Sequence, residues 1–316
     1  MILPDFYRPT KYGWTIKSDR TLTRKIHDSP GNFRSAHSTF FENGFRRWGD
    51  LTKPAIKVLV LGDSYTEDIY VSNGEEWYAY LEKAFKDVEL FVYGAGGYGS
   101  LQEFLVLDDF IDEIDPDVVV WQFCSNDYSN NLYAWDRSHY PNNNFGVRPY
   151  LENGQVIYRL PLPFPELRKY SKFADLLLRL YDVKMKQWND TIFSSTSLAS
   201  AREVNNDERM LVMAQEKERA GFEVTQTILQ MARRRTGEVP FFLLFADQMT
   251  EKERRFCQIE DMTCIPGIFE HLERKEAQGN VVRVVDDGHW NLAGNRFVGE
   301  YLVNYFKNNP RITQLH

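Results

Sequence analysis

Residues 56–66 read IKVLVLGDSYT, a short apolar run that passes directly into a tight polar turn. An apolar run of this length, closed by a turn signal, is typical of a buried strand, here over residues 56–61. The residues from about 75 to 86 have the pattern of a helix. A buried strand that leads through a turn into a helix is typical of a parallel α/β sheet, so this segment decides the fold class.

The alternation of strand and helix continues along the chain. We predict further strands over residues 89–93, 117–123, 240–245 and 281–285. We predict further helices at about residues 101–114, 206–235, 268–277 and 292–307, the last of them capped by Asn291. Parallel strands joined by helices form a sheet that is covered on both faces. We therefore expect an α/β fold, a three-layer α/β/α sandwich with a five-stranded, mostly parallel, doubly wound (flavodoxin-like) sheet.

Two segments do not follow this alternation. Residues 1–54 are rich in Pro, Gly, Thr and aromatic residues, and we interpret them as an irregular leader packed on the core domain, residues 55–316. Residues 128–200 are polar and aromatic, with one helix expected near 167–188. Because a structureless loop of that length is rare inside a compact domain, we interpret this segment as a lid-like insert.

The composition excludes two classes of protein. The chain has 316 residues, with 38 Lys and Arg against 45 Asp and Glu, and a net charge of −7. A nucleic-acid-binding protein usually has a basic stripe, and a membrane span needs about 20 consecutive apolar residues. The sequence has neither feature, so we expect no nucleic-acid partner and no transmembrane segment.

The three cysteines indicate neither a disulfide framework nor a zinc site, since the chain has no paired C-x-x-C and no H-E-x-x-H spacing. Cys257 and Cys264 are able to pair in an oxidising compartment, but free thiols are the default expectation.

The N-terminus has neither the basic segment nor the apolar run of a signal peptide. We therefore expect a cytoplasmic protein, or a periplasmic or secreted one if a signal peptide has been removed. We also expect that it needs no metal and no cofactor.

Glycines and polar residues follow four of the predicted strands, and ligands bind at the carboxyl ends of the strands in such a sheet. The four loops are residues 62–66 (GDSYT), 94–99 (GAGGYG), 124–127 (CSND) and 286–291 (DDGHWN). They bring a serine, a glycine-rich backbone, an amide and an Asp-x-x-His pair to one edge. A nucleophile, oxyanion donors, a base and a carboxylate that orients the base are the groups that acyl transfer requires.

Each loop also has a structural interpretation. Residues 62–64 suit an ordinary strand-to-helix turn, and a lone His289 is more often a hydrogen-bonded core histidine than a catalyst. Residues 94–99 also match G-x-G-x-x-G, the dinucleotide fingerprint. That fingerprint belongs after the first strand, whereas this loop follows the second and leaves Ser64 and His289 unexplained. The joint occurrence of four pieces at four strand ends favours acyl transfer.

The four loops resemble the sequence blocks of the SGNH (GDSL-type) hydrolase family over about residues 56–306, outside the insert. The resemblance implies Ser64 as the nucleophile and His289 as the general base. It also implies an oxyanion hole formed by the backbone N–H groups of Ser64 and Gly97 and by the side-chain amide of Asn126. One position departs from the family pattern, because Cys124 stands where the third block usually has glycine, which would narrow the pocket.

Two adjacent carboxylates precede His289, and only one of them is expected to orient the imidazole. Adjacent side chains that leave a strand point to opposite faces. Gly288 lets the chain turn back, which favours closure over three residues, and the family resemblance implies the same spacing. We therefore predict that Asp286 orients His289, and that Asp287 faces solvent or holds the loop through backbone hydrogen bonds.

The expected function is hydrolysis of a carboxylic ester through a Ser-His-Asp triad and an acyl-enzyme, with a small-molecule or saccharide ester as substrate. The candidate substrate contacts adjoin the site loops and are Tyr65, Tyr98, Cys124, Tyr128 and Trp290. The aromatic residues of the insert, among them Tyr133 and Trp135, form either a lid over the substrate or the insert's own core; their mixture with polar residues favours a carbohydrate O-acetyl ester. The alternatives are an O-acyltransferase that uses the same triad on a saccharide, and a non-catalytic polysaccharide-binding module on the same fold.

Overall fold

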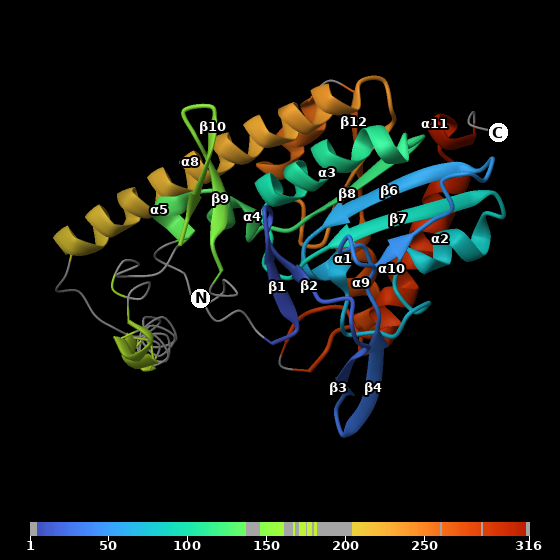
Figure 1. Cartoon of the computed structure of the whole chain (residues 1–316), viewed down its shortest axis with the longest axis horizontal. Coiled ribbons are helices and arrows are strands. Elements are labelled where there is room, and N and C mark those ends of the chain that lie inside the picture. The colour runs from blue at the N-terminus through green and yellow to red at the C-terminus, as the bar shows by residue number, and fades with distance from the viewer. Residues whose placement is uncertain are drawn as a thin grey trace.

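The computed structural model describes residues 5–136, 146–160, 167, 171–174, 176–178, 180–181, 204–259, 261–285 and 287–313. Its centre is a six-stranded sheet with the strand order β12-β11-β8-β6-β7-β5 (Figure 1). In that order the strands span Met262–Ile265, Phe241–Phe245, Val118–Phe123, Ile56–Gly62, Val88–Gly94 and Arg47–Trp48. β5 pairs antiparallel with β7, and the other five strands are parallel. The predicted doubly wound sheet is confirmed, with one short antiparallel strand added at its edge.

Successive strand residues point to opposite faces and build two separate cores. In β6, Leu59 and Leu61 belong to one core, whereas Val58 and Val60 belong to the other. The first core is covered by α3 (Ser100–Ile114) and α8 (Val204–Thr236), which lie side by side in Figure 1. The second is covered by α2 (Ala79–Ala84), α9 (Ile268–Ala277) and α10 (Leu292–Lys307), with the short α11 (Pro310–Thr313) at the end of the chain. Each fully buried Val or Leu contributes about 1.5–3 kcal/mol to this layered packing.

Most predicted helices have the expected bounds, and one is shorter. α9 and α10 match residues 268–277 and 292–307, and Asn291 caps α10 by accepting a hydrogen bond from Gly294 N (2.9 Å). α2 begins only at Ala79, because the residues before it form turns. There, Glu76 is buried in an ion pair with Arg46 (2.9 Å).

One predicted strand is wrong. Residues 281–285 are described but lie outside the sheet, and the fifth parallel strand is β12, which pairs with β11. Residues 282–291 instead fold back on themselves, with a hydrogen bond from Val284 N to His289 O (2.8 Å). Val282 and Val284 are both buried, which explains the apolar pattern that predicted a strand.

The leader contains regular structure, although its composition predicts an irregular segment. It forms two antiparallel hairpins, β1 (Tyr7–Thr10) with β2 (Gly13–Ile16), and β3 (Leu22–Ser29) with β4 (Asn32–Ser38). In Figure 1 the β3–β4 hairpin projects from the body of the molecule. Its backbone also contacts the loop that carries His289, because Val285 N donates to His27 O (2.9 Å). The leader therefore helps to position that loop.

The described part of the insert begins with two short helices, α4 (Asp127–Asn130) and α5 (Tyr133–Asp136), and continues with a hairpin of β9 (Arg148–Glu152) and β10 (Gln155–Arg159). Most of the helix predicted near 167–188 lies outside the described residues. The Tyr133 ring packs on Tyr150, with centroids 5.3 Å apart, and Trp135 packs against the core. Tyr133 therefore contributes to the packing of the insert itself, and Trp135 to its contact with the core of the domain.

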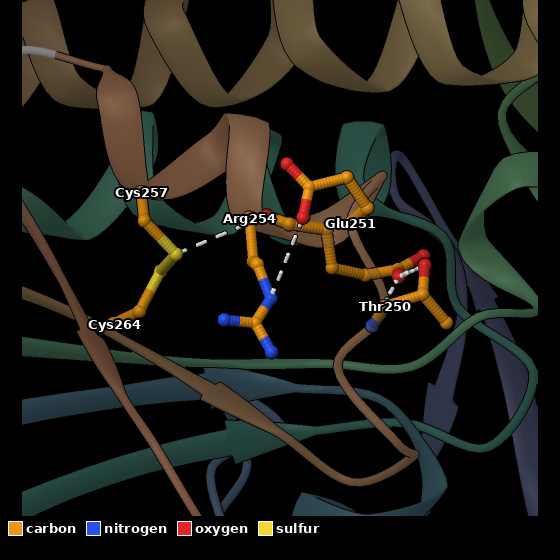
Figure 2. The surroundings of a disulfide bond; sticks show 6 residues. Thr250, Glu251, Arg254, Cys257 and Cys264 are labelled. Atoms are coloured by element: carbon orange, nitrogen blue, oxygen red, sulfur yellow. Dashed lines mark hydrogen bonds and ion pairs between the residues drawn. A yellow bond between two sulfur atoms is a disulfide. The ribbon is translucent and has the colours of Figure 1, made fainter.

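A disulfide joins Cys257 of the 3₁₀ helix η3 (Glu253–Gln258) to Cys264 of β12 (Figure 2). The chain returns along η3 into β12, which brings the two Cα atoms to 5.4 Å, within the usual range for a disulfide. The expectation of free thiols is therefore wrong for this pair. Cys124 is a free cysteine and is buried.

Candidate active site

The turn after β6 places Ser64 at the start of a short helix, α1 (Ser64–Glu67). Asp63 caps this helix, since its Oδ1 accepts a hydrogen bond from Tyr65 N (3.1 Å), which is the turn role that the sequence predicts. Gly62 has no room for a side chain, because a Cβ there would lie 2.3 Å from the nearest side-chain oxygen. The strand end, the glycine and the cap together fix Ser64 at the carboxyl edge of the sheet.

Ser64 lies beside His289, although 225 positions separate them in the sequence. Ser64 Oγ and His289 Nε2 are 2.7 Å apart and hydrogen-bonded. The other ring nitrogen, Nδ1, is hydrogen-bonded to the carboxylate of Asp287. In this arrangement the imidazole is able to accept the hydroxyl proton, while the carboxylate fixes the tautomer and orientation of the ring.

The carboxylate on His289 is not the one that the sequence predicts. Asp287, expected to face solvent, contacts Nδ1 of His289 and also accepts a hydrogen bond from the Tyr70 hydroxyl (3.0 Å). The prediction assumed strand alternation up to residue 286, but the chain already turns at Val284, whose carbonyl accepts from Asp287 N (3.3 Å). Asp286 itself lies outside the described residues.

The electrostatic surroundings of Asp287 favour its ionised form. Burial acts to raise the pKa of this carboxyl group, but the hydrogen bonds from His289 and Tyr70 outweigh burial and hold the pKa below its ordinary value. An ionised carboxylate is the form that accepts a hydrogen bond from Nδ1–H. It therefore leaves Nε2 as the acceptor nitrogen that faces Ser64.

Two tyrosine rings pack on the His289 imidazole. The Tyr70 ring stacks on it with centroids 4.5 Å apart, and the Tyr65 ring is tilted against it at 4.8 Å. Tyr70 was not predicted as a site residue, because nothing in the sequence around it distinguishes it from a core tyrosine. With its ring on the imidazole and its hydroxyl on Asp287, Tyr70 restrains both groups at once.

The glycine loop after β7 reaches the same site through Gly96 and Gly97. Gly97 has a φ of +75°, in the left-handed region that favours glycine. The Gly96 carbonyl accepts a hydrogen bond from Trp14 Nε1 (3.0 Å). Because the C=O and N–H of a trans peptide point in opposite directions, the Gly97 N–H points away from Trp14.

Arg148 of β9 holds the next carbonyl of this loop. Its side chain is fully buried, Nη2 donates to Gly97 O (2.6 Å), and the guanidinium forms an ion pair with Asp136 (3.1 Å). The guanidinium also lies over the Trp14 ring, 5.0 Å from its centroid. No sequence signal distinguishes Arg148 from an exposed arginine of a hairpin strand, so this link between insert and glycine loop was missed.

The loop after β8 contributes Cys124 and Asn126. Oδ1 of Asn126 is buried and has no hydrogen-bond partner among the described residues. Asn126 lies in the wall of the cavity that Ser64 and His289 also line. Cys124 donates its thiol hydrogen to Asp247 Oδ2 (3.2 Å) and lies in the cavity wall, as its place in the sequence predicts.

A cavity of about 440 Å³ unites these groups. Its lining residues are Phe6, Tyr7, Arg24, Asp63, Ser64, Tyr65, Glu67, Ile69, Tyr70, Gly96, Gly97, Cys124, Asn126 and His289. The structure thus brings together predicted residues from each of the four site loops, among them Ser64, Gly97, Asn126 and His289. It adds a wall from the leader that no motif indicated, because the leader meets the site only in three dimensions.

Three predicted substrate contacts do not line this cavity. Tyr98 is fully buried in the core, and the Tyr128 hydroxyl donates to Glu253 (2.7 Å) away from the site. Trp290 is buried behind Tyr65, with ring centroids 4.7 Å apart. A residue close in sequence to a site loop can point its side chain either into the cavity or into the core. These three side chains point into the core.

Glu67 is a buried carboxyl group in the cavity wall. Its Oε1 accepts a hydrogen bond from the Tyr7 hydroxyl (2.8 Å), and the backbone N–H of Gly96 also donates to it. Burial raises the pKa of Glu67 to about 7, and the hydrogen bonds offset only part of this effect. The group therefore links α1, the leader and the glycine loop.

The described part of the chain shows no grouping of three or more His, Cys, Asp or Glu side chains that would suit a metal ion. Of the helices in the described ranges, none is both long and apolar enough to cross a membrane.

The sequence matches no protein-family model and no curated protein. By structure, the chain is similar to a member of the lipolytic G-D-S-L family from Veillonella parvula, with 10% identity over 81% of this chain and 100% of that chain and a TM-score of 0.42. It is similar to the psychrotrophic esterase EstA from a Pseudoalteromonas species, with 10% identity over 80% of this chain and 99% of that chain and a TM-score of 0.41. A catalytic mutant of an acetylxylan esterase from Geobacillus stearothermophilus has 10% identity over 81% of this chain and 95% of that chain, with a TM-score of 0.41. The structural neighbours of this chain thus include GDSL-family lipolytic enzymes and esterases.

Proposed function

We propose that the protein is a serine hydrolase that cleaves carboxylic esters with a triad of Ser64, His289 and Asp287. The observation that carries this proposal is the pair of contacts at His289, with Ser64 Oγ 2.7 Å from Nε2 and the Asp287 carboxylate on Nδ1. A serine hydroxyl is a weak nucleophile until an adjacent base accepts its proton. The base lies next to the hydroxyl here, and both line a cavity that is open to a small ligand.

The reaction has two halves. Ser64 Oγ attacks the ester carbonyl carbon as its proton passes to His289 Nε2, and the bond to the alcohol oxygen then breaks as that oxygen takes the proton and leaves. In the second half, a water molecule gives a proton to Nε2 and attacks the acyl-enzyme, which releases the carboxylic acid and returns the proton to Ser64. Asp287 keeps Nε2 in the acceptor form and stabilises the imidazolium in both halves.

Three donors stabilise the oxyanion in this proposal, namely the N–H groups of Ser64 and Gly97 and the side-chain amide of Asn126. Support comes from the Gly97 peptide, whose N–H points away from Trp14, and from the position of Asn126 in the cavity wall. A donor of this kind contributes about 3–4 kcal/mol to stabilisation of the transition state.

The substrate in this proposal is a small-molecule ester or an ester of a saccharide, which a cavity of about 440 Å³ accommodates. The preference for a carbohydrate O-acetyl ester stays a prediction, because Tyr133 and Trp135 are engaged in packing. Transfer of the acyl group to a saccharide hydroxyl requires the same triad and differs only in the acceptor of the second half-reaction.

Turnover of p-nitrophenyl acetate tests the proposal. We expect Ser64→Ala to fold and to lose about 10⁴- to 10⁶-fold in kcat. Ser125→Ala is the matched control, because it removes another hydroxyl at the same edge of the sheet, one that donates to Asp247 (2.6 Å). Equal turnover by the wild type and Ser64→Ala would contradict the proposal. Acetylated oligosaccharides with a saccharide acceptor then separate hydrolysis, which releases acetate, from acyl transfer, which acetylates the acceptor.

A further inference from the structure

Arg24 places a positive charge in the wall of the cavity that Ser64 also lines. It lies on β3 of the leader, and its side chain lines the cavity together with Tyr70. Within the described chain, its guanidinium forms no ion pair and no hydrogen bond with a protein group. The Tyr70 ring supports it instead, with the guanidinium carbon 5.3 Å from the ring centroid.

Neighbouring arginines show what a structural arginine does in this part of the molecule. Arg34 of β4 forms an ion pair with Glu75, and Arg46 forms a buried ion pair with Glu76 (2.9 Å). Arg24 differs from both, because it lines the cavity and forms no ion pair with a carboxylate of the described residues; its charge acts on Glu67 only at longer range. Its contact with the rest of the described chain is therefore the packing over the Tyr70 ring and not an ion pair.

The carboxyl groups of the cavity are bound to other donors. Glu67 accepts a hydrogen bond from the Tyr7 hydroxyl (2.8 Å), and Asp63 accepts one from Tyr65 N (3.1 Å). Neither forms an ion pair with Arg24. The planar guanidinium thus remains available for a ligand, and its fork of N–H donors suits the paired oxygens of a carboxylate, phosphate or sulfate.

Tyr70 links this cation to the reacting groups. The Arg24 guanidinium lies over the Tyr70 ring in a cation–π contact. The same ring stacks on the His289 imidazole, and the two ring centroids are 4.5 Å apart. Ser64, His289 and Arg24 line the same cavity of about 440 Å³. A small ester with its carbonyl carbon at Ser64 is therefore able to extend to Arg24.

We propose that Arg24 binds an anionic group of the substrate, so that the enzyme acts on esters that carry a carboxylate, phosphate or sulfate near the scissile bond. This inference rests on the proposed esterase function. The anionic group belongs either to the acyl part or to the alcohol part of the ester, and the chemistry of its recognition by the guanidinium is the same in both cases.

Two matched pairs of esters test this inference. Monoethyl succinate against ethyl succinamate places the charge on the acyl side, and 4-acetoxybenzoate against 4-acetoxybenzamide places it on the alcohol side. We expect the wild type to favour the anionic member of one pair by about 10- to 100-fold in kcat/KM, the range of a charge-assisted hydrogen bond. Arg24→Gln should bring this ratio close to one through a higher KM for the anionic ester, and Arg24→Lys should retain part of it.

Lys25→Gln is the matched control, because it removes the same charge from the next residue of β3, which is exposed and lies over the Phe33 ring. It should keep the wild-type ratio. An equal loss in Lys25→Gln, an equal loss for both members of a pair in Arg24→Gln, or a wild type that cleaves the neutral esters equally well would overturn the inference. If the wild type turns over p-nitrophenyl acetate but none of the four esters, this inference alone is overturned. If it turns over neither p-nitrophenyl acetate nor any of the four esters, the proposed function is overturned, and this inference with it.

Discussion

Asp287 and Tyr70 act on His289 from two directions. The Asp287 carboxylate holds Nδ1, and Tyr70 both stacks on the ring and donates to the same carboxylate (3.0 Å). The pKa of Asp287 lies below its ordinary value, so the carboxylate is ionised at neutral pH. The orientation of the imidazole therefore depends on an ionised carboxylate that accepts hydrogen bonds from both His289 and Tyr70.

Exchange of this carboxylate for an amide tests its role. Asp287→Asn should lower kcat for ester hydrolysis by about 10³- to 10⁴-fold, because an amide stabilises the wrong tautomer of the imidazole. Asp286→Asn is the control and should cost less than about tenfold, or 1.4 kcal/mol. Steady-state kinetics with p-nitrophenyl acetate measures both variants. A larger loss in Asp286→Asn would restore Asp286 as the orienting residue.

Glu67 predicts a dependence of stability on pH. Its pKa is raised by burial from an ordinary value of 4.5 to about 7, so the folded protein binds this proton more tightly than the unfolded chain does. The contribution of Glu67 to stability is therefore complete below about pH 4.5 and is lost as the pH rises to about 7, a loss of about 3 kcal/mol.

In Glu67→Gln, which stays neutral, the free energy of unfolding should fall less between pH 4.5 and pH 7 than in the wild type, by about 3 kcal/mol. Urea unfolding at the two pH values measures this difference. The same pH dependence in both proteins would show that folding does not raise the pKa of Glu67.

At this scale, sequence reasoning singled out Ser64, Gly97 and Asn126, which lie in loops directly after strands, and the structure places them in one cavity with His289. His289 was singled out by its Asp-x-x-His spacing and by a strand expected over residues 281–285 that the structure does not form. It favoured Asp286 from alternation along a strand, from the turn at Gly288 and from the family spacing, whereas the structure places the Asp287 carboxylate on His289. The turn at Val284 depends on contacts between distant segments, and a local pattern does not report them.

Among the elements, the β9–β10 hairpin of the insert supports the glycine loop through a hydrogen bond to Gly97. Arg148 of β9 is fully buried, contacts the Gly97 carbonyl and pairs with Asp136. Loss of one partner of a buried ion pair leaves the other charge without compensation. The hairpin is therefore part of the support of the site and more than a cover.

Arg148→Met should lower the free energy of unfolding by about 3–5 kcal/mol, because Asp136 would keep a buried charge without its cation. Arg159→Met is the matched control on the same hairpin, since the ion pair of Arg159 with Glu152 is exposed to solvent and contributes little. Chemical denaturation of the two variants compares them. Equal stability of both would show that the Arg148 ion pair contributes no more than a surface pair.

The predicted elements differ in accuracy for a physical reason. α10 has the predicted bounds, because a polar cap and an amphipathic pattern are local signals. The strand predicted over 281–285 is wrong and β12 was missed, because the two short apolar runs differ only in their long-range partners. The hairpins of the leader were missed for the same reason, because their strands are recognised only by their pairing and their sequence has no strong alternation of its own.

For the whole molecule, the alternation of strands and helices was sufficient to predict the layered fold, whereas the disulfide was not predictable from spacing. Cys257 and Cys264 are seven positions apart and join η3 to β12. Disulfides persist in oxidising compartments. The cytoplasmic location stays a prediction, and this bond favours an oxidising compartment instead.

A loop of this length predicts that the disulfide contributes about 2–3 kcal/mol to stability. Cys257→Ala should show this loss in urea unfolding. Alkylation of the unfolded, unreduced protein should add one label, at Cys124, and prior reduction should raise the number of labels to three. Three labels without reduction would contradict the disulfide.

The most direct measurement of the central claim is the mass of the intact protein after treatment with a serine-directed phosphonate. Activation of Ser64 by His289 and Asp287 predicts one adduct, mapped to Ser64, in the wild type and in Ser125→Ala. It predicts no adduct in Ser64→Ala and a strongly slowed reaction in Asp287→Asn. An unmodified wild-type protein, or an adduct on any other residue, would contradict the assignment of Ser64 as the nucleophile.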